Sequence, residues 1–158
     1  MKIAILKNAT GAVTVVHFAN ETDAKALSKY RDAIFPGMEI VGECDPSTLP
    51  SWRFLDCWRH NGKTVIVDMA LAREQRLTEI RSERMSRFVA LDAEWMRATG
   101  QKRAAEADAI EARRQLLRDI PQMLIGQKAL DGVVCKALLS DCRTVEELET
   151  LVPTWPEP

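Results

Sequence analysis

The chain has 158 residues, of which 46% are hydrophobic and 28% are charged, and its formal net charge is −1 at pH 7. This composition suits one globular domain or two small ones, and the near balance of charges argues against disorder. No stretch approaches the roughly 20 consecutive apolar residues of a membrane span, and Lys7 interrupts the first apolar run too early for a secretory signal. We therefore expect an intracellular protein, and composition alone does not assign its function.

The first 69 residues are predicted to form a small α/β unit with β-hairpins. Two β-branched or apolar runs, Lys2 to Lys7 and Val13 to Phe18, flank a turn sequence at residues 8–11. A helix is expected next, capped by Thr22 and ended by Pro36-Gly37, with apolar positions at Ala26, Leu27, Tyr30, Ala33 and Ile34. A short strand is predicted over residues 38–42.

A second hairpin is expected around Asn61-Gly62, because both residues tolerate the positive φ angles of a two-residue type I′ turn. That turn would bury an aromatic face and pair Trp58 with Val65, Asp56 with Val67 and Phe54 with Met69. A helical interpretation of residues 51–60 is an alternative, since Phe54 and Trp58 also have i, i+4 spacing.

A long helix is predicted from residue 70 to about Thr99, capped by Asp68 and ended by Gly100 in the left-handed conformation. Roughly 30 residues of helix span about 45 Å, which exceeds the diameter of a small domain. An alanine-rich helix of residues 101–119 is expected to fold back beside it and to end before Pro121. Because alanines bury little area, we expect this helix pair to pack against a subunit or another protein.

The remaining residues are expected to form short helices, with a break near Gly132 and a capping box from Thr144 to Glu147. Residues 153–158 are predicted to be a loose proline-rich tail, in which Trp155 can dock on a partner. The expected fold class is thus α+β, with an α/β unit at 1–69, a long helical hairpin at 70–121, and short helices with a tail at 122–158.

Little in the sequence points to catalysis or cofactor binding. The four cysteines, Cys44, Cys57, Cys135 and Cys142, form no C-x-x-C pair, and no glycine-rich phosphate loop or G-x-S-x-G motif occurs. His17 and His60 have no neighbouring carboxylate or cysteine motif, so no metal site is expected. We predict no catalytic residue, no cofactor and no enzymatic activity. An enzyme whose site is assembled in space, around Asp56, His60 and Asp68, is an alternative.

The long predicted helix carries six arginines: Arg73, Arg76, Arg81, Arg84, Arg87 and Arg97. Phosphate binding needs a net positive potential, but residues 70–120 hold eleven basic and nine acidic side chains, which leaves only +2. Arginine also suits protein interfaces and carboxylate pairing. A protein partner is therefore preferred, and a nucleic-acid-binding regulatory protein is the alternative.

Three segments carry a family resemblance: residues 80–84 (Ile-Arg-Ser-Glu-Arg), Leu91-Asp92 with Trp95, and residues 114–121 (Arg-Gln-Leu-Leu-Arg-Asp-Ile-Pro). Residues 80–121 resemble the small assembly-chaperone-like proteins encoded beside tail-fibre genes in tailed bacteriophages. In that family an arginine-bearing helix precedes an Asp-Trp element, which here is split by Ala93-Glu94. Residues 54–58 and 67–69 also look like those of phage tail-region proteins.

The resemblance implies a non-enzymatic protein that binds a tail-fibre or other tail component, as an assembly chaperone or as a virion connector. The expected places are the host cytoplasm during assembly and the virion tail. A homo-oligomer is a further expectation, and neither a membrane nor nucleic acid is an expected partner. The predicted partner-binding residues are Arg84, Phe88, Leu91, Trp95, Leu117 and Arg118.

Overall fold

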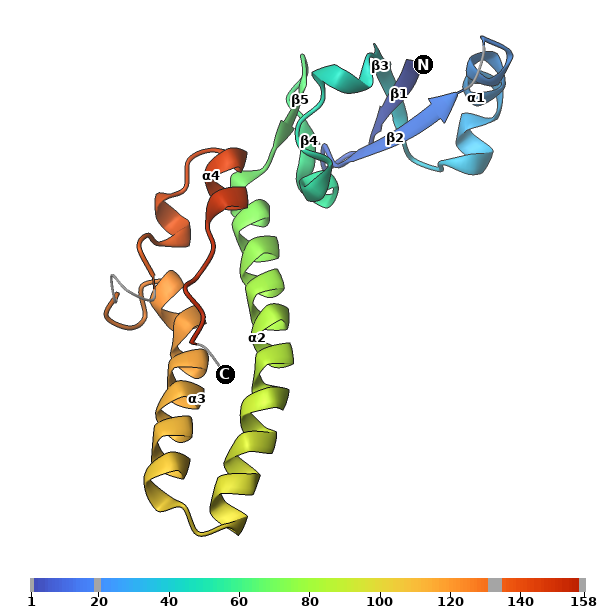
Figure 1. Cartoon of the computed structure of the whole chain (residues 1–158). Helices are drawn as coiled ribbons and strands as arrows, with labels where there is room; N and C mark the ends of the chain where they lie inside the picture. Colours follow the sequence, from blue (N-terminus) through green and yellow to red (C-terminus); the bar gives the residue numbers. More distant parts are fainter. Residues whose placement is uncertain (1, 19–20, 131–134, 157–158) are drawn as a thin grey trace. The chain divides into compact units, whose positions relative to one another are not determined.

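The computed structural model describes residues 2–18, 21–130 and 135–156 (Figure 1). Its elements, with η for a 3₁₀ helix, are β1 (Lys2–Lys7), β2 (Val13–Phe18), α1 (Glu21–Ile34), β3 (Glu39–Cys44), η1 (Pro46–Thr48), η2 (Trp52–Cys57), β4 (Trp58–His60), β5 (Val65–Val67), α2 (Met69–Gly100), α3 (Ala104–Leu124), η3 (Leu139–Asp141) and α4 (Val145–Thr150). The predicted α+β class is confirmed. The chain divides into two compact units, Met1–Ala72 and Arg73–Pro158.

The first unit is built on an antiparallel sheet in the order β2-β1-β3. The predicted first hairpin is confirmed: Lys7 pairs with Val13, and the Asn8 side chain accepts hydrogen bonds from the backbone N–H groups of Thr10 and Ala12, both at 3.0 Å. Alternate residues of β1 bury opposite faces of the sheet. One face packs with Leu27 of α1 in a core that includes Ala4, Leu6 and Phe18.

Helix α1 differs from expectation in its start and in its buried face. It begins at Glu21, so Thr22 lies inside the helix and is not its cap. Of the five expected apolar positions only Leu27 is buried, whereas Tyr30 is 50% and Ile34 is 58% exposed. Periodicity therefore identified the helix, but only one of these positions faces the sheet.

The second hairpin forms with a different register from the one predicted. Trp58 pairs with Val67 and His60 with Val65, so residues 61–64 form the loop. The Asn61 side chain accepts hydrogen bonds from the N–H groups of Lys63 (3.0 Å) and Thr64 (2.9 Å), which stabilises this longer turn. Residues 52–57 are the 3₁₀ helix η2, so the helical alternative for residues 51–60 holds for that part and is wrong for residues 58–60, which form β4. Phe54 and Trp58 are fully buried.

Helix α2 has the predicted cap and ends at Gly100, one residue after the predicted end at about Thr99. The Asp68 carboxylate accepts hydrogen bonds from the N–H groups of Ala70 (3.0 Å) and Leu71 (3.3 Å), which confirms the cap. Gly100 is still helical, and the left-handed residue is Lys102, with φ of 57°. The N–H of Arg103 donates a hydrogen bond to the Ala98 carbonyl at 2.9 Å, so the turn is a Schellman motif centred on Lys102.

Helix α3 runs through Pro121, where the sequence predicted its end. The proline leaves the Leu117 carbonyl without its usual helical donor. The extra turn compensates by burying Met123 and Leu124, and Pro121 itself is buried. The chain then turns at Gly126, whose φ of 75° lies in the left-handed region that favours glycine over residues with a Cβ.

The C-terminal residues pack on the helix pair. The capping box is confirmed, since the Glu147 N–H donates to the Thr144 hydroxyl at 3.3 Å and the Thr144 N–H donates to Glu147 at 3.1 Å. The predicted break near Gly132 lies outside the described residues. The expected loose tail is not observed for Trp155, which is half-buried with the Arg87 guanidinium 4.9 Å from its ring centroid.

Candidate functional site

The six predicted partner-binding residues lie on the facing sides of α2 and α3. Leu91 and Leu117 are 2% and 0% exposed, so they form the floor between the helices and do not reach solvent as predicted contact residues would. Their burial follows from the antiparallel pairing of two helices whose large apolar residues are few. The other four side chains are half-buried around this floor: Arg84, Phe88, Trp95 and Arg118.

Arginines cover the two aromatic rings on this side of the helix pair. The guanidinium carbons of Arg84 and Arg118 lie 6.0 and 5.8 Å from the Phe88 ring centroid. Arg114 lies 5.1 Å from the Trp95 centroid in the same way. These are cation–π distances, and the contacts made by Arg114 and Arg118 join α3 to α2. We call this surface the arginine–aromatic face, consisting of Arg84, Phe88, Trp95, Arg114 and Arg118.

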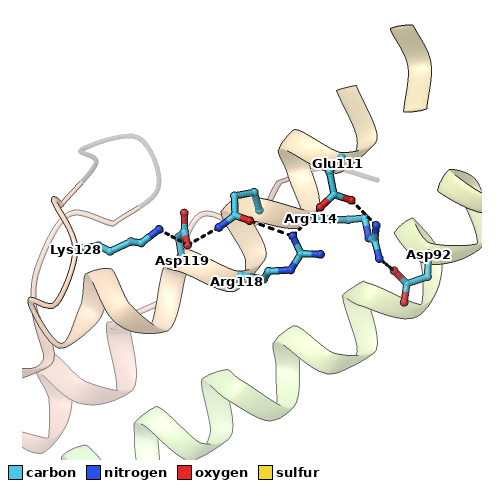
Figure 2. Close-up of polar contacts among 7 residues, drawn as sticks. Asp92, Glu111, Arg114, Arg118, Asp119 and Lys128 are labelled. Atoms are coloured by element: carbon cyan, nitrogen blue, oxygen red, sulfur yellow. Dashed lines mark hydrogen bonds and ion pairs between the residues drawn. The ribbon is translucent and has the colours of Figure 1, made fainter. Parts of the chain in front are cut away.

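Most of the cations on this face are held by carboxylates (Figure 2). Arg114 of α3 bridges the helices through an ion pair with Asp92 at 2.8 Å and also binds Glu111. Arg118 binds Glu111 at 2.7 Å and the Gln115 side chain at 3.1 Å. The Arg118 hydrogen bond, helped by Arg114, lowers the pKa of Glu111 against the opposing effect of desolvation. The network therefore fixes Arg114 and Arg118 in place.

Arg84 differs from these two arginines. Its buried Nε, like that of Arg114, has no hydrogen-bond partner in the described part of the chain, so the difference lies in the ion pairs. Its guanidinium contacts the Phe88 ring four residues along α2 and forms no ion pair with any described residue. A guanidinium presents five donors in a fork that matches a carboxylate. Arg84 is thus the cation on this face that is best placed to accept an acidic group from outside.

The C-terminal segment of the chain also packs on α2. Arg73 donates to the Cys142 carbonyl at 2.7 Å, and Arg76 donates to the Leu151 carbonyl at 2.9 Å. Arg87 contacts Trp155 further along α2. In Figure 1 the C-terminal segment accordingly runs beside α2 and α3.

Arg114 is the member of this face that sequence reasoning missed as a contact residue. Its ion pair with Glu111 lies within α3. The contact with Trp95 crosses to the other helix. Sequence signals for it were the i, i+4 spacing of Arg114 and Arg118 and the predicted fold-back of the second helix.

Neither of the two described cavities lined by His60 includes Asp56 or Asp68. A cavity of about 270 Å³ is lined in part by Cys44, His60 and Lys63 but by neither Asp56 nor Asp68. Asp68 caps α2, and His60 accepts a hydrogen bond from the Gly62 N–H at Nδ1, 3.2 Å away. No group of three or more His, Cys, Asp or Glu side chains in the described ranges is arranged to hold a metal ion.

Comparison with known proteins gives no match to this chain among family models, curated proteins or solved structures. Within residues 2–18, 21–130 and 135–156, no helix has both the length and the apolar content needed to cross a membrane.

Proposed function

We propose that this chain is a non-enzymatic protein-binding component of a bacteriophage tail, which acts on a tail-fibre or other tail component as an assembly chaperone or as a virion connector. The observation that carries the binding role is the arginine–aromatic face, where Arg84 has no carboxylate partner among the described residues. The viral setting is supported by the resemblance of residues 80–121 to tail-fibre assembly proteins.

The chemistry of this face suits a protein partner. Tryptophan and arginine are the residues that most often dominate the energy of protein interfaces, especially when they surround an apolar centre. Leu91 and Leu117 supply such a centre from below. A partner that brings an acidic side chain to Arg84 and apolar atoms to Phe88 and Trp95 would complete both kinds of contact.

Co-purification with the tail-fibre protein tests the proposal. We expect Arg84→Ala together with Trp95→Ala to weaken binding by about a thousandfold, because truncating each hot-spot residue costs about 2 kcal/mol. A matched control removes an exposed arginine and an exposed apolar side chain elsewhere in the same unit, Arg143→Ala with Val152→Ala. Circular dichroism of both proteins verifies that the helices persist.

Unchanged affinity in the folded Arg84→Ala/Trp95→Ala protein would refute this binding face, and so would an equal loss in the control. Mass spectrometry of purified particles separates the two roles. A connector is present in the mature particle in a fixed ratio to the fibre, whereas a chaperone is absent from it.

A further inference from the structure

Helix α2 carries an exposed stripe that neither α3 nor the C-terminal segment covers. Consecutive members of this outer stripe are three or four residues apart, which keeps them on one side of the helix. Met85, Val89 and Met96 are 59%, 72% and 69% exposed. The members are Thr78, Ser82, Met85, Val89, Ala93, Met96 and Gly100, all of them exposed and none charged. Three large apolar side chains in one exposed row indicate a surface that another molecule covers.

The outer stripe is self-complementary in size about Val89. Met85 lies four positions before Val89 and Ala93 four positions after it. Ser82 and Met96 lie seven positions before and after, and Thr78 and Gly100 lie eleven positions before and after. In each pair a larger side chain is matched by a smaller one, and a Cβ added to Gly100 would meet open space.

We propose that the occupant is a second copy of this chain, with the two α2 helices packed antiparallel about a two-fold axis at Val89. Such a symmetric interface uses the same patch on both copies, so the patch must complement itself. The axis places Met85 of one copy opposite Ala93 of the other, and Met96 opposite Ser82. Each methionine then fills the space that a small residue leaves, as in the packing of ridges into grooves.

The charges beside the outer stripe complement one another in the same arrangement. Arg97 and Glu79 are eighteen residues apart, which is five helical turns, so they lie on the same flank of α2. Arg97 lies eight positions after Val89, and Glu79 lies ten positions before it. The two-fold axis therefore places Arg97 of one copy two residues from Glu79 of the other, an offset of about 3 Å along the helix. Arg97 is exposed, and the Glu79 side chain is 29% exposed.

This self-association does not rest on the proposed function, because the outer stripe and the arginine–aromatic face are different sides of α2. Light scattering of the purified full chain gives the first test. We expect a mass approaching twice the 17.8 kDa of one chain as concentration rises. Val89→Glu should return the mass to that of one chain, whereas Val152→Glu, at a residue that is 65% exposed outside the stripe, should not.

Cysteine cross-linking tests the axis itself, in a Cys44→Ser background because the other three native thiols are buried. Val89→Cys should form a covalent dimer under mild oxidation, and Ser86→Cys, which lies off the stripe, should not. A mixture of Ser82→Cys and Met96→Cys chains should cross-link to each other, and neither should cross-link to itself. A single-chain mass at all concentrations, or self-cross-linking of Ser82→Cys, would overturn the proposal.

Discussion

Arg76 is the one charged side chain that is almost fully buried among the described residues, at 2% exposure. A buried guanidinium is tolerated only when acceptors replace the water it has lost. Glu79 and Glu83 bind it at 3.1 and 3.0 Å, and the Leu151 carbonyl accepts its remaining Nη. Arg76 therefore anchors the C-terminal segment to α2 as well as satisfying two acids.

Replacing Arg76 should loosen the C-terminal segment. We expect Arg76→Ala to lower the free energy of unfolding by about 2–3 kcal/mol, less than for a fully buried pair because its acidic partners are partly exposed. Hydrogen exchange should also become faster in α4. The control is Arg81→Ala, at an exposed arginine of the same helix, where a change within about 0.5 kcal/mol is expected. Equal effects of the two substitutions would contradict this anchoring role.

Glu111 makes the helix pair sensitive to pH in a defined direction. Its pKa is lowered in the folded protein, so its contribution to stability is present above the unfolded pKa and is lost as the pH falls through the folded value. In urea unfolding, the difference between wild type and Glu111→Gln should be largest at pH 7 and should close as the pH falls below about 4. Arg118→Gln should reduce the same pH dependence, and a wild-type difference that grows toward acid would contradict the assignment.

At the residue scale, sequence patterns identified two of the three predicted N-caps, and they identified contact residues only in part. Asp68 and Thr144 were predictable because a cap depends on neighbours within three residues. The burial of Leu91 and Leu117 depends on how two helices pair, and periodicity alone does not distinguish a residue that meets the second helix from one that meets a partner. Arg84 and Arg118 both contact Phe88, whereas Trp95 contacts Arg114, which was not among the predicted residues.

At the scale of elements, the ends of the helices were less predictable than the helices themselves. Gly100 and Pro121 were both expected to end helices. Helix α2 does end at Gly100, but the left-handed residue is Lys102, and α3 continues through Pro121 to Leu124. The α2 turn closes through a hydrogen bond from Arg103 to Ala98, and α3 continues because its last turn buries apolar residues. The register of the second hairpin also differs from the prediction. The Asn61 side chain stabilises a four-residue loop, whereas an Asn-Gly pair predicts a two-residue turn.

The end of α2 offers a gain in stability. Lys102 has a φ of 57°, where a side chain costs about 1 kcal/mol relative to glycine. Lys102→Gly should therefore raise the free energy of unfolding by about 0.5–1 kcal/mol. Thr99→Gly, at an exposed helical residue three positions earlier, should lower it by a similar amount. Chemical denaturation of both variants measures the difference, and destabilisation by Lys102→Gly would show that its side chain has a role beyond the turn.

At the scale of the whole molecule, the chain divides into two units where the sequence suggested three parts. Charge counts separated residues 70–121 from the acidic end, but the helix pair and the C-terminal segment form one unit, Arg73–Pro158. Arg73 and Arg76 explain this, because both donate to carbonyls near the C-terminus. Such contacts span about seventy residues of sequence and leave no local signal.

Because the two units are separately compact, we expect a destabilising substitution in one unit to leave the other unit folded. Phe54 is fully buried in the first unit and Leu148 in the second. Phe54→Ala should cost about 3–5 kcal/mol and speed hydrogen exchange in β1 and β3 while α3 keeps its protection. Leu148→Ala should do the reverse. Because α2 starts in one unit and continues into the other, its first turns are the only segment expected to respond to both substitutions. Faster hydrogen exchange in α3 of the Phe54→Ala protein would contradict this expectation. It would mean that the two units unfold together.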